Sequence, residues 1–97
     1  MRITVQFAAQ IRQAAGTGST IVETADGMNV NQLVCHVADG SNDTLKNLLL
    51  SSDNMLQPAL LVFVNDKLIQ RSRKPAPCSV TLSDGDVVTL MSPMSGG

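Results

Sequence analysis

The sequence predicts an α+β fold in which one mixed sheet carries its helices on a single face. Three observations lead to this class: alternating strand patterns at both ends of the chain, a strongly amphipathic segment at residues 30–38, and the order hairpin, helix, strand, short strand, strand. With 97 residues, of which 43% are hydrophobic, the chain suits one small domain with its own core. We expect this domain to span residues 1–91, followed by a flexible tail at 92–97.

The first element is a strand, because Ile3, Val5 and Phe7 alternate with polar residues. Residues 10–15 indicate a helical turn that Gly16-Thr17-Gly18 ends. Residues 19–24 are rich in Thr, Ile and Val and predict a second strand, which would pair with the first as a hairpin.

A helix is predicted next, because apolar residues recur on one face at helical spacing, at Val30, Leu33, Val34, Val37 and Ala38. Asn29 suits its N-cap with Gln32 at N3, and Gly40 suits a left-handed residue after its last turn. Residues 44–50 predict a second, shorter helix.

The remaining elements are strands and turns. Residues 60–64 form a continuous apolar run, which predicts a central strand buried on both faces. Asn65-Asp66 offers a turn into a short strand at 67–69, and the region of Pro75 and Pro77 is expected to be a surface loop. A turn at Ser83-Asp84-Gly85-Asp86 leads into the last strand, residues 87–91.

Composition argues against several classes of protein. Seven Lys and Arg against eight Asp and Glu give a net charge of −1, which does not suit a nucleic-acid binder. The longest apolar run, residues 59–64, is far shorter than the ~20 residues of a membrane span, and no secretory signal follows Met1, so we expect a cytoplasmic protein. Cys35 and Cys78 lie outside any metal-ligand spacing and are expected to be thiols.

The candidate chemistry lies at Gly96-Gly97. Two residues without Cβ atoms can thread a narrow channel and let a partner's backbone approach the terminal carboxylate closely. Such a carboxylate, at the end of an extended segment, can be delivered as a nucleophile into another protein's active site. The alternative is a frayed terminus without function.

Four segments of the sequence are typical of a known family: Phe7-Ala8-Ala9-Gln10-Ile11-Arg12, Val64-Asn65, Leu82-Ser83-Asp84-Gly85-Asp86-Val87-Val88 and Pro93-Met94-Ser95-Gly96-Gly97. Through them the sequence resembles the MoaD/ThiS family of sulfur carriers, and within it the small subunits of molybdopterin synthase. The fold that this resemblance implies is the ubiquitin-like β-grasp.

The resemblance also implies a reaction cycle. A MoeB-like adenylyltransferase would use ATP and Mg²⁺ to activate the Gly97 carboxylate, and a sulfur donor would convert it to a thiocarboxylate. The tail, with Gly96 beside the reacting residue, would then enter a MoaE-like large subunit and give its sulfur to a pterin precursor, which builds the dithiolene of the molybdenum cofactor. The carrier would itself bind no cofactor and no metal.

Five further residues are expected to contact a partner. Leu68 and Met91 would lie beside the tail on the uncovered sheet face, although scattered exposed apolar residues are common. Pro93 would stiffen the arm through its fixed φ, unless it merely stops the strand, and Met94 and Ser95 complete the tail.

Other functions remain open within and beyond the family. The chain could be a ThiS-like carrier for the thiamine thiazole, a carrier for another sulfur pathway or for protein conjugation, or a β-grasp interaction module without sulfur chemistry. Two helical stretches between Gly27 and Leu50, and Pro93 four residues before the end, favour the synthase subunit.

Overall fold

The computed structural model describes residues 1–51, 55–57, 60–70 and 80–92. The expected loop around Pro75 and Pro77, together with Cys78, lies outside these residues. The elements follow one another as β1 (Arg2–Ala8), α1 (Gln10–Ala15), β2 (Ser19–Glu23), α2 (Val30–Asp39), α3 (Asp43–Leu49), β3 (Leu61–Val64), β4 (Lys67–Gln70) and β5 (Val87–Met91). Each expected strand and helix is therefore present, with bounds that differ from the expected ones by at most one residue at either end.

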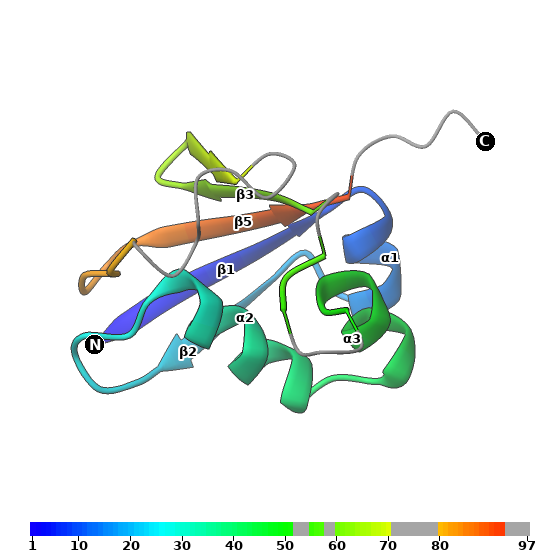
Figure 1. The fold of residues 1–97 in the computed structure, drawn as a ribbon, viewed down its shortest axis with the longest axis horizontal. Helices are drawn as coiled ribbons and strands as arrows, with labels where there is room; N and C mark the ends of the chain where they lie inside the picture. The colour runs from blue at the N-terminus through cyan, green and yellow to red at the C-terminus, as the bar shows by residue number, and fades with distance from the viewer. Residues whose placement is uncertain (52–54, 58–59, 71–79, 93–97) are drawn as a thin grey trace.

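The strands form one mixed sheet with the order β2-β1-β5-β3-β4. β1 pairs antiparallel with β2 and parallel with β5, while β3 pairs antiparallel with both β5 and β4. The first and last strands of the chain thus lie side by side in the interior of the sheet (Figure 1).

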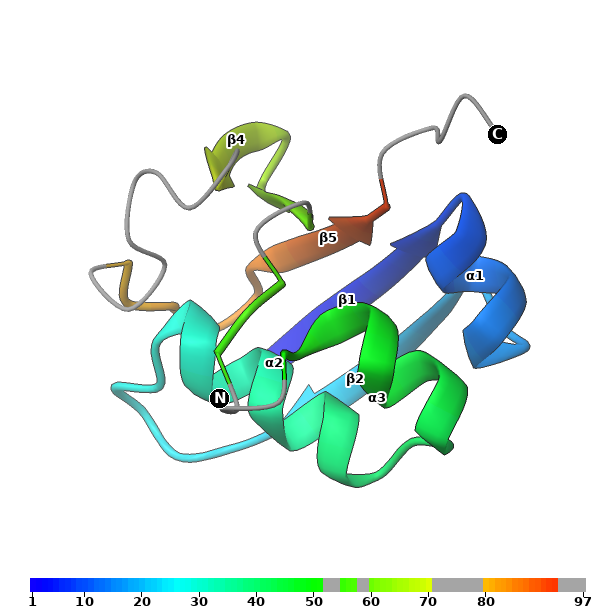
Figure 2. The ribbon, with the colours of Figure 1, turned by 45° about the vertical axis from the view of Figure 1, so that its right-hand side comes forward.

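The core lies between this sheet and the helices, which cover one of its faces (Figures 1 and 2). Ile3 and Val5 of β1 and Val88 and Leu90 of β5 are fully buried, whereas their neighbours along each strand are more exposed. The predicted apolar face of α2 is buried as well, at Val30, Leu33, Val34, Val37 and Ala38. The apolar residues that alternate along the strands and those that recur at helical spacing on α2 thus pack into a single core.

The predicted capping box at the start of α2 is confirmed. The Asn29 side chain accepts a hydrogen bond from the Gln32 N–H at 2.8 Å, and the Gln32 side chain accepts one from the Asn29 N–H at 3.0 Å. The expectation of a left-handed residue at the other end is wrong, because Gly40 has a φ of −91°. There the Ser41 hydroxyl donates to the Val37 carbonyl at 2.6 Å, which satisfies one of the last carbonyls without a left-handed residue.

The expectation that residues 60–64 are buried on both faces is wrong. Val62 is fully buried, but Leu61 and Phe63 are only half-buried. The described helices lie on one face of the sheet, so alternate residues of β3 face the side that no helix covers.

A two-residue turn joins β3 to β4, and both of its residues have positive φ: 51° at Asn65 and 69° at Asp66. This combination is that of a type I′ turn, for which Asn-Gly is the preferred pair. We therefore expect Asp66→Gly to stabilise the protein by about 0.5–1 kcal/mol, because glycine adopts positive φ without steric cost. Chemical unfolding monitored by circular dichroism measures the change.

The matched control is Asn65→Gly in the same turn. The Asn65 side chain accepts a hydrogen bond from the Val87 N–H at 3.0 Å and donates one to Asp86 at 2.9 Å. We expect this variant to be less stable by about 1–2 kcal/mol, because it loses both bonds. A lower stability of Asp66→Gly would contradict the strain argument.

Candidate functional site

The beginning of β5 is held on both sides by the Asp84-Gly85-Asp86 turn. The Asp86 carboxylate accepts hydrogen bonds from the Ser83 N–H at 2.8 Å and from the Asn65 side chain at 2.9 Å. The Asp86 carbonyl accepts from the Thr4 N–H at 3.0 Å. One residue thus ties β5 to β1 and to the turn between β3 and β4.

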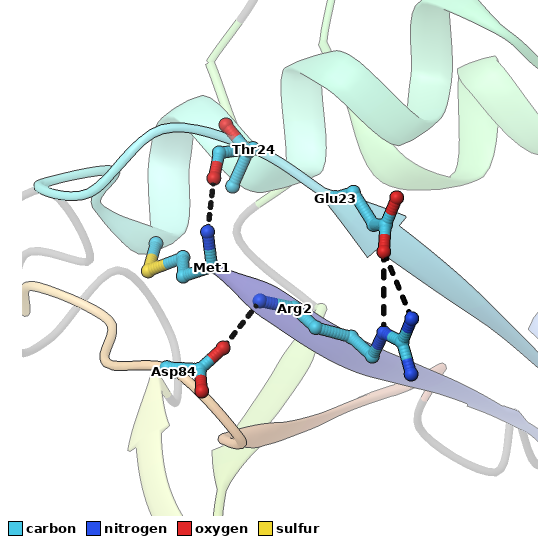
Figure 3. Close-up of polar contacts among 5 residues, drawn as sticks. All are labelled: Met1, Arg2, Glu23, Thr24 and Asp84. Atoms are coloured by element: carbon cyan, nitrogen blue, oxygen red, sulfur yellow. Dashed lines mark hydrogen bonds and ion pairs between the residues drawn. The ribbon is translucent and has the colours of Figure 1, made fainter.

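The same turn is bonded to the start of the chain (Figure 3). The Asp84 carboxylate accepts from the Arg2 N–H at 2.7 Å, and the Gly85 N–H donates to the Arg2 carbonyl at 2.8 Å. On the other side of β1, the Arg2 guanidinium pairs with Glu23 of β2 at 3.0 Å, and the Met1 amine donates to the Thr24 carbonyl. The motif that carries the family resemblance therefore fixes the register of β5 within the sheet.

The carboxyl end of β5 lies in the interior of the sheet, where Met91 pairs with Ala8 of β1 and Leu61 of β3. At ~3.3 Å per residue, Met91 is about 17 Å along the strand from Asp86. Ser92 follows and is buried, at 8% exposure. The predicted site residues Pro93, Met94, Ser95, Gly96 and Gly97 lie outside the described residues. The structure describes the chain up to Ser92, the residue that precedes them.

Leu68 and Met91, which the sequence predicts to contact a partner, lie on the same face of the sheet, opposite the face that the described helices cover. Leu68 is 40% exposed on β4 and pairs with Phe63, while Met91 is half-buried and pairs with Leu61. The two predicted residues are two strands apart, and the side chains of β3 lie between them. We call Leu61, Phe63, Leu68 and Met91 together the apolar face patch.

Sequence reasoning missed Leu61 and Phe63 as members of this patch. A continuous apolar run hides the alternation between faces, so the sequence alone predicts a strand that is buried on both faces. The signal that identifies them is register, because Leu61 lies opposite Met91 and Phe63 opposite Thr89, both on the face away from the buried Val88 and Leu90.

Helix α2 carries a thiol and an imidazole: Cys35 is half-buried and His36 is exposed. Burial raises the pKa of the Cys35 thiol, and the nearby Asp39 carboxylate raises it further. The thiol is thus protonated at neutral pH and is a weak nucleophile.

A cavity of about 360 Å³ lies beside β2 rather than β5. Its walls come mainly from β2, the last part of α2 and the residues that follow α2, with Val22 and Val37 among them. Within the described ranges, no three His, Cys, Asp or Glu side chains gather where they could hold a metal ion. In the same part of the chain, no helix has the length and apolarity needed to span a membrane.

Comparison with known proteins relates both the sequence and the fold to one group. A family model described as "ThiS family" matches residues 5–97, which includes the segment beyond β5. None of the curated proteins matches the chain significantly.

Solved structures share the fold. SAMP1 (small archaeal modifier protein 1) from Haloferax volcanii is 20% identical, with a TM-score of 0.83 over 100% of both chains. Urm1 from Trypanosoma brucei is 28% identical, with a TM-score of 0.74 over 99% of this chain and 95% of that one. Subunits 1 and 2 of the molybdopterin-converting factor from Helicobacter pylori were solved as a complex; the matching chain is 23% identical, with a TM-score of 0.61 over 100% of both chains. The predicted ubiquitin-like β-grasp fold is thereby confirmed.

Proposed function

Because the chain belongs to the ThiS family, we propose that it is a sulfur carrier whose Gly97 carboxylate becomes a thiocarboxylate, and that it serves as the small subunit of a molybdopterin synthase. The observation that carries this proposal is the position of β5. A strand held between β1 and β3, with its register set by Asp84, Gly85 and Asp86, presents the last residues of the chain from a fixed point of the sheet. The family match extends over those residues to Gly97.

The chemistry divides between the carrier and its partners. In a MoeB-like adenylyltransferase, a Gly97 carboxylate oxygen attacks the α-phosphorus of ATP bound with Mg²⁺, and pyrophosphate leaves. Hydrosulfide released by the sulfur donor then adds to the acyl carbon and displaces AMP, which is a far better leaving group than oxide, and the product is the thiocarboxylate. A terminal carboxyl group, with a reference pKa of about 3.3–3.7, is ionised at neutral pH and ready for the first step.

In the second half of the cycle, the tail enters a MoaE-like large subunit. The thiocarboxylate sulfur attacks an electrophilic carbon of the pterin precursor and displaces the group bound there, which gives a thioester. Water then cleaves the bond between the acyl carbon and sulfur, so the sulfur stays on the pterin and the Gly97 carboxylate is returned. Gly96, Ser95, Met94 and Pro93 form the part of the chain that passes through the partner's channel, where the absence of a Cβ at Gly96 leaves room beside the reacting residue. Catalytic side chains come from the partners.

The direct test is an incubation of the whole chain with an activating enzyme, MgATP and a sulfur donor, followed by intact mass measurement. We expect the mass gain of one oxygen-to-sulfur exchange, located at Gly97 by fragmentation. Conversion of a pterin precursor after addition of a large subunit then assigns the pathway. An unchanged mass with several activating enzymes of this class would refute the proposal.

A second candidate is a ubiquitin-like modifier, which the similarity over 100% of both chains to a protein named small archaeal modifier protein 1 favours. Activation would be the same, but the acyl group would pass to a lysine amine instead of sulfur. The two functions differ in the product: a thiocarboxylate in one case, an isopeptide-linked conjugate in the other.

The apolar face patch gives a prediction about partner binding. We expect Leu68→Asp to weaken binding of the large subunit roughly 5- to 30-fold, because it places a charge in a desolvated apolar contact. Leu68 is 40% exposed in the isolated chain, so we expect the thermal transition of the Leu68→Asp variant to change little. Titration calorimetry measures the affinity.

The matched control is Ile21→Asp. Ile21 is 57% exposed and lies on β2, at the opposite edge of the sheet from Leu68. We expect it to retain the wild-type affinity within about a factor of 2, as surface contacts away from an interface do. Equal losses for the two variants would argue against the apolar face patch as the docking surface.

A further inference from the structure

The two edges of the described sheet differ in how they are protected. An exposed strand edge can pair with another chain, and proteins prevent this with lysine, proline or irregular pairing. At one edge, β4 begins with Lys67, and its register against β3 shifts between Val62 and Phe63. At the other edge, β2 pairs with β1 in an unbroken register and contains no lysine, proline or glycine (Figure 1). Of the two, β2 offers the regular edge to which a further strand can add.

The hydrogen bonds to β1 show which backbone groups of β2 face outward. The Phe7 N–H donates to the Gly18 carbonyl at 2.9 Å. Bonded positions alternate along an antiparallel pair, so Thr20 also bonds to β1, whereas the N–H and C=O of Ile21 point away from it. Because β2 is the last strand of the described sheet, no described strand receives these two groups. Ile21 thus presents one donor and one acceptor at the edge.

The space beside this edge has room for a side chain of a partner. Thr20 lies on the same face of the sheet as the buried Val22, yet Thr20 is exposed. It lines the cavity of about 360 Å³ together with Val22 and Val37. Phe7 and Leu45, which are both buried, line the cavity as well. The cavity is therefore apolar within and open at the edge strand, which suits an aliphatic side chain.

A positive charge lies at the beginning of the same edge. The Arg12 guanidinium lies beside Gly18, the residue before β2, where an added Cβ would be 3.6 Å from Nε of Arg12. Arg12 is exposed, and among the described residues no carboxylate forms an ion pair with it. At the end of β2, the Glu23 carboxylate already pairs with Arg2 at 3.0 Å. Among the described groups along β2, Arg12 is therefore the charge that a ligand can match.

We propose that the edge of β2 binds an extended segment of another protein, which adds to the sheet as an antiparallel strand. The segment's residue opposite Ile21 exchanges two hydrogen bonds with it and covers its side chain, which is 57% exposed. The next residue, opposite Thr20, faces the helices and places an aliphatic side chain in the cavity. The residue opposite Gly18, two positions further on, is acidic and pairs with Arg12.

The recognised pattern is thus two aliphatic residues, any residue, and then Asp or Glu. A second copy of this chain fits the edge less well. Paired antiparallel through its own β2 around Ile21, it would bring Thr24 opposite Gly18, which supplies no carboxylate to Arg12. This inference goes beyond the proposed function, and its test involves no sulfur chemistry.

The probe is the capped peptide Ser-Thr-Val-Leu-Ser-Glu-Ser, titrated into the whole isotope-labelled chain and followed by two-dimensional NMR of the protein's amides. We expect shifts in β2 and in the last part of α2, and none at the apolar face patch. Arg12→Glu should weaken binding of this peptide about 3- to 10-fold. The same peptide with Lys in place of Glu should bind Arg12→Glu more tightly than it binds the wild type. This exchange of charges tests the pairing without a change to the core.

The backbone pairing is tested with Ile21→Pro, which removes the outward N–H. Proline is tolerated on an edge strand where its N–H would face solvent, so we expect a folded variant that binds about 10-fold or more weakly. Ile21→Val is the matched control, because it keeps the N–H and a branched apolar side chain, and it should bind within about 2-fold of the wild type. If the proline variant does not fold, as its amide spectrum shows, the exchange of charges at Arg12 decides.

Three results would overturn the inference. The first is the absence of shifts in β2 at every soluble concentration of the peptide. The second is an unchanged affinity of Arg12→Glu for the acidic peptide. The third is a change of the β2 signals with protein concentration when no peptide is present, which would identify a second copy of the chain as the occupant.

Discussion

Deletion of Gly97 is expected to abolish thiocarboxylate formation and leave the fold intact. The segment starts beyond β5, whose own residues Val88 and Leu90 supply the burial in the core. Loss of Gly97 removes the reacting carboxylate from its place and leaves these buried residues of β5 unchanged. Activity and stability should therefore separate, with activity falling by at least about 100-fold, the cost of a misplaced reacting group.

Gly96→Val is expected to have an effect of similar size for a different reason. A branched side chain next to the reacting residue narrows the clearance within the partner's channel and restricts the backbone. A displacement of about 1 Å at the carboxylate is enough for a loss on the order of 100-fold in rate.

Both variants are measured by intact mass after incubation with an activating enzyme, MgATP and a sulfur donor, and by thermal unfolding. Gly40→Ala is the matched control, because Gly40 has a φ of −91° and an added Cβ would meet its nearest atom at 3.9 Å, an ordinary contact. This glycine substitution in the body should retain the wild-type rate. If the chain without Gly97 still gains sulfur, the central claim about its function is wrong.

Val34→Asp is expected to unfold a large part of the population, the largest effect on stability that we foresee. Val34 is 0% exposed and belongs to the core between α2 and the sheet. A carboxylate placed there has no partner, and an unpaired buried charge costs several kcal/mol against a total stability of about 5–15 kcal/mol.

Urea unfolding followed by far-UV circular dichroism measures this loss of stability. His36→Asp introduces the same side chain on the exposed part of the same helix and should cost less than about 1 kcal/mol. A Val34→Asp variant as stable as His36→Asp would contradict the assignment of this helix face to the core.

The type of each element could be predicted from local sequence, because it depends on spacing within the element. The alternation at Ile3, Val5 and Phe7 requires one buried strand face wherever the strand lies. The capping box of Asn29 and Gln32 is likewise a contact between residues three apart, and the structure contains it as predicted. The family resemblance also depended on local segments, and the match over residues 5–97 supports it.

The candidate site could be predicted only in part. Leu68 and Met91 were placed correctly on the uncovered face, but Leu61 and Phe63 between them were not recognised. An apolar run has no alternation from which to infer its buried face, so only the register of β3 against β5 identifies that face.

By itself, the sequence determined the strands, the helices, the helix start at Asn29 and the position of Gly96-Gly97 at the end of the chain. The tertiary structure alone decided that Asp86 joins β5 to Thr4 and Asn65, and that Leu61 lies opposite Met91. The reason is that spacing along a chain sets local conformation, whereas burial and long-range hydrogen bonds depend on which distant segments pack together.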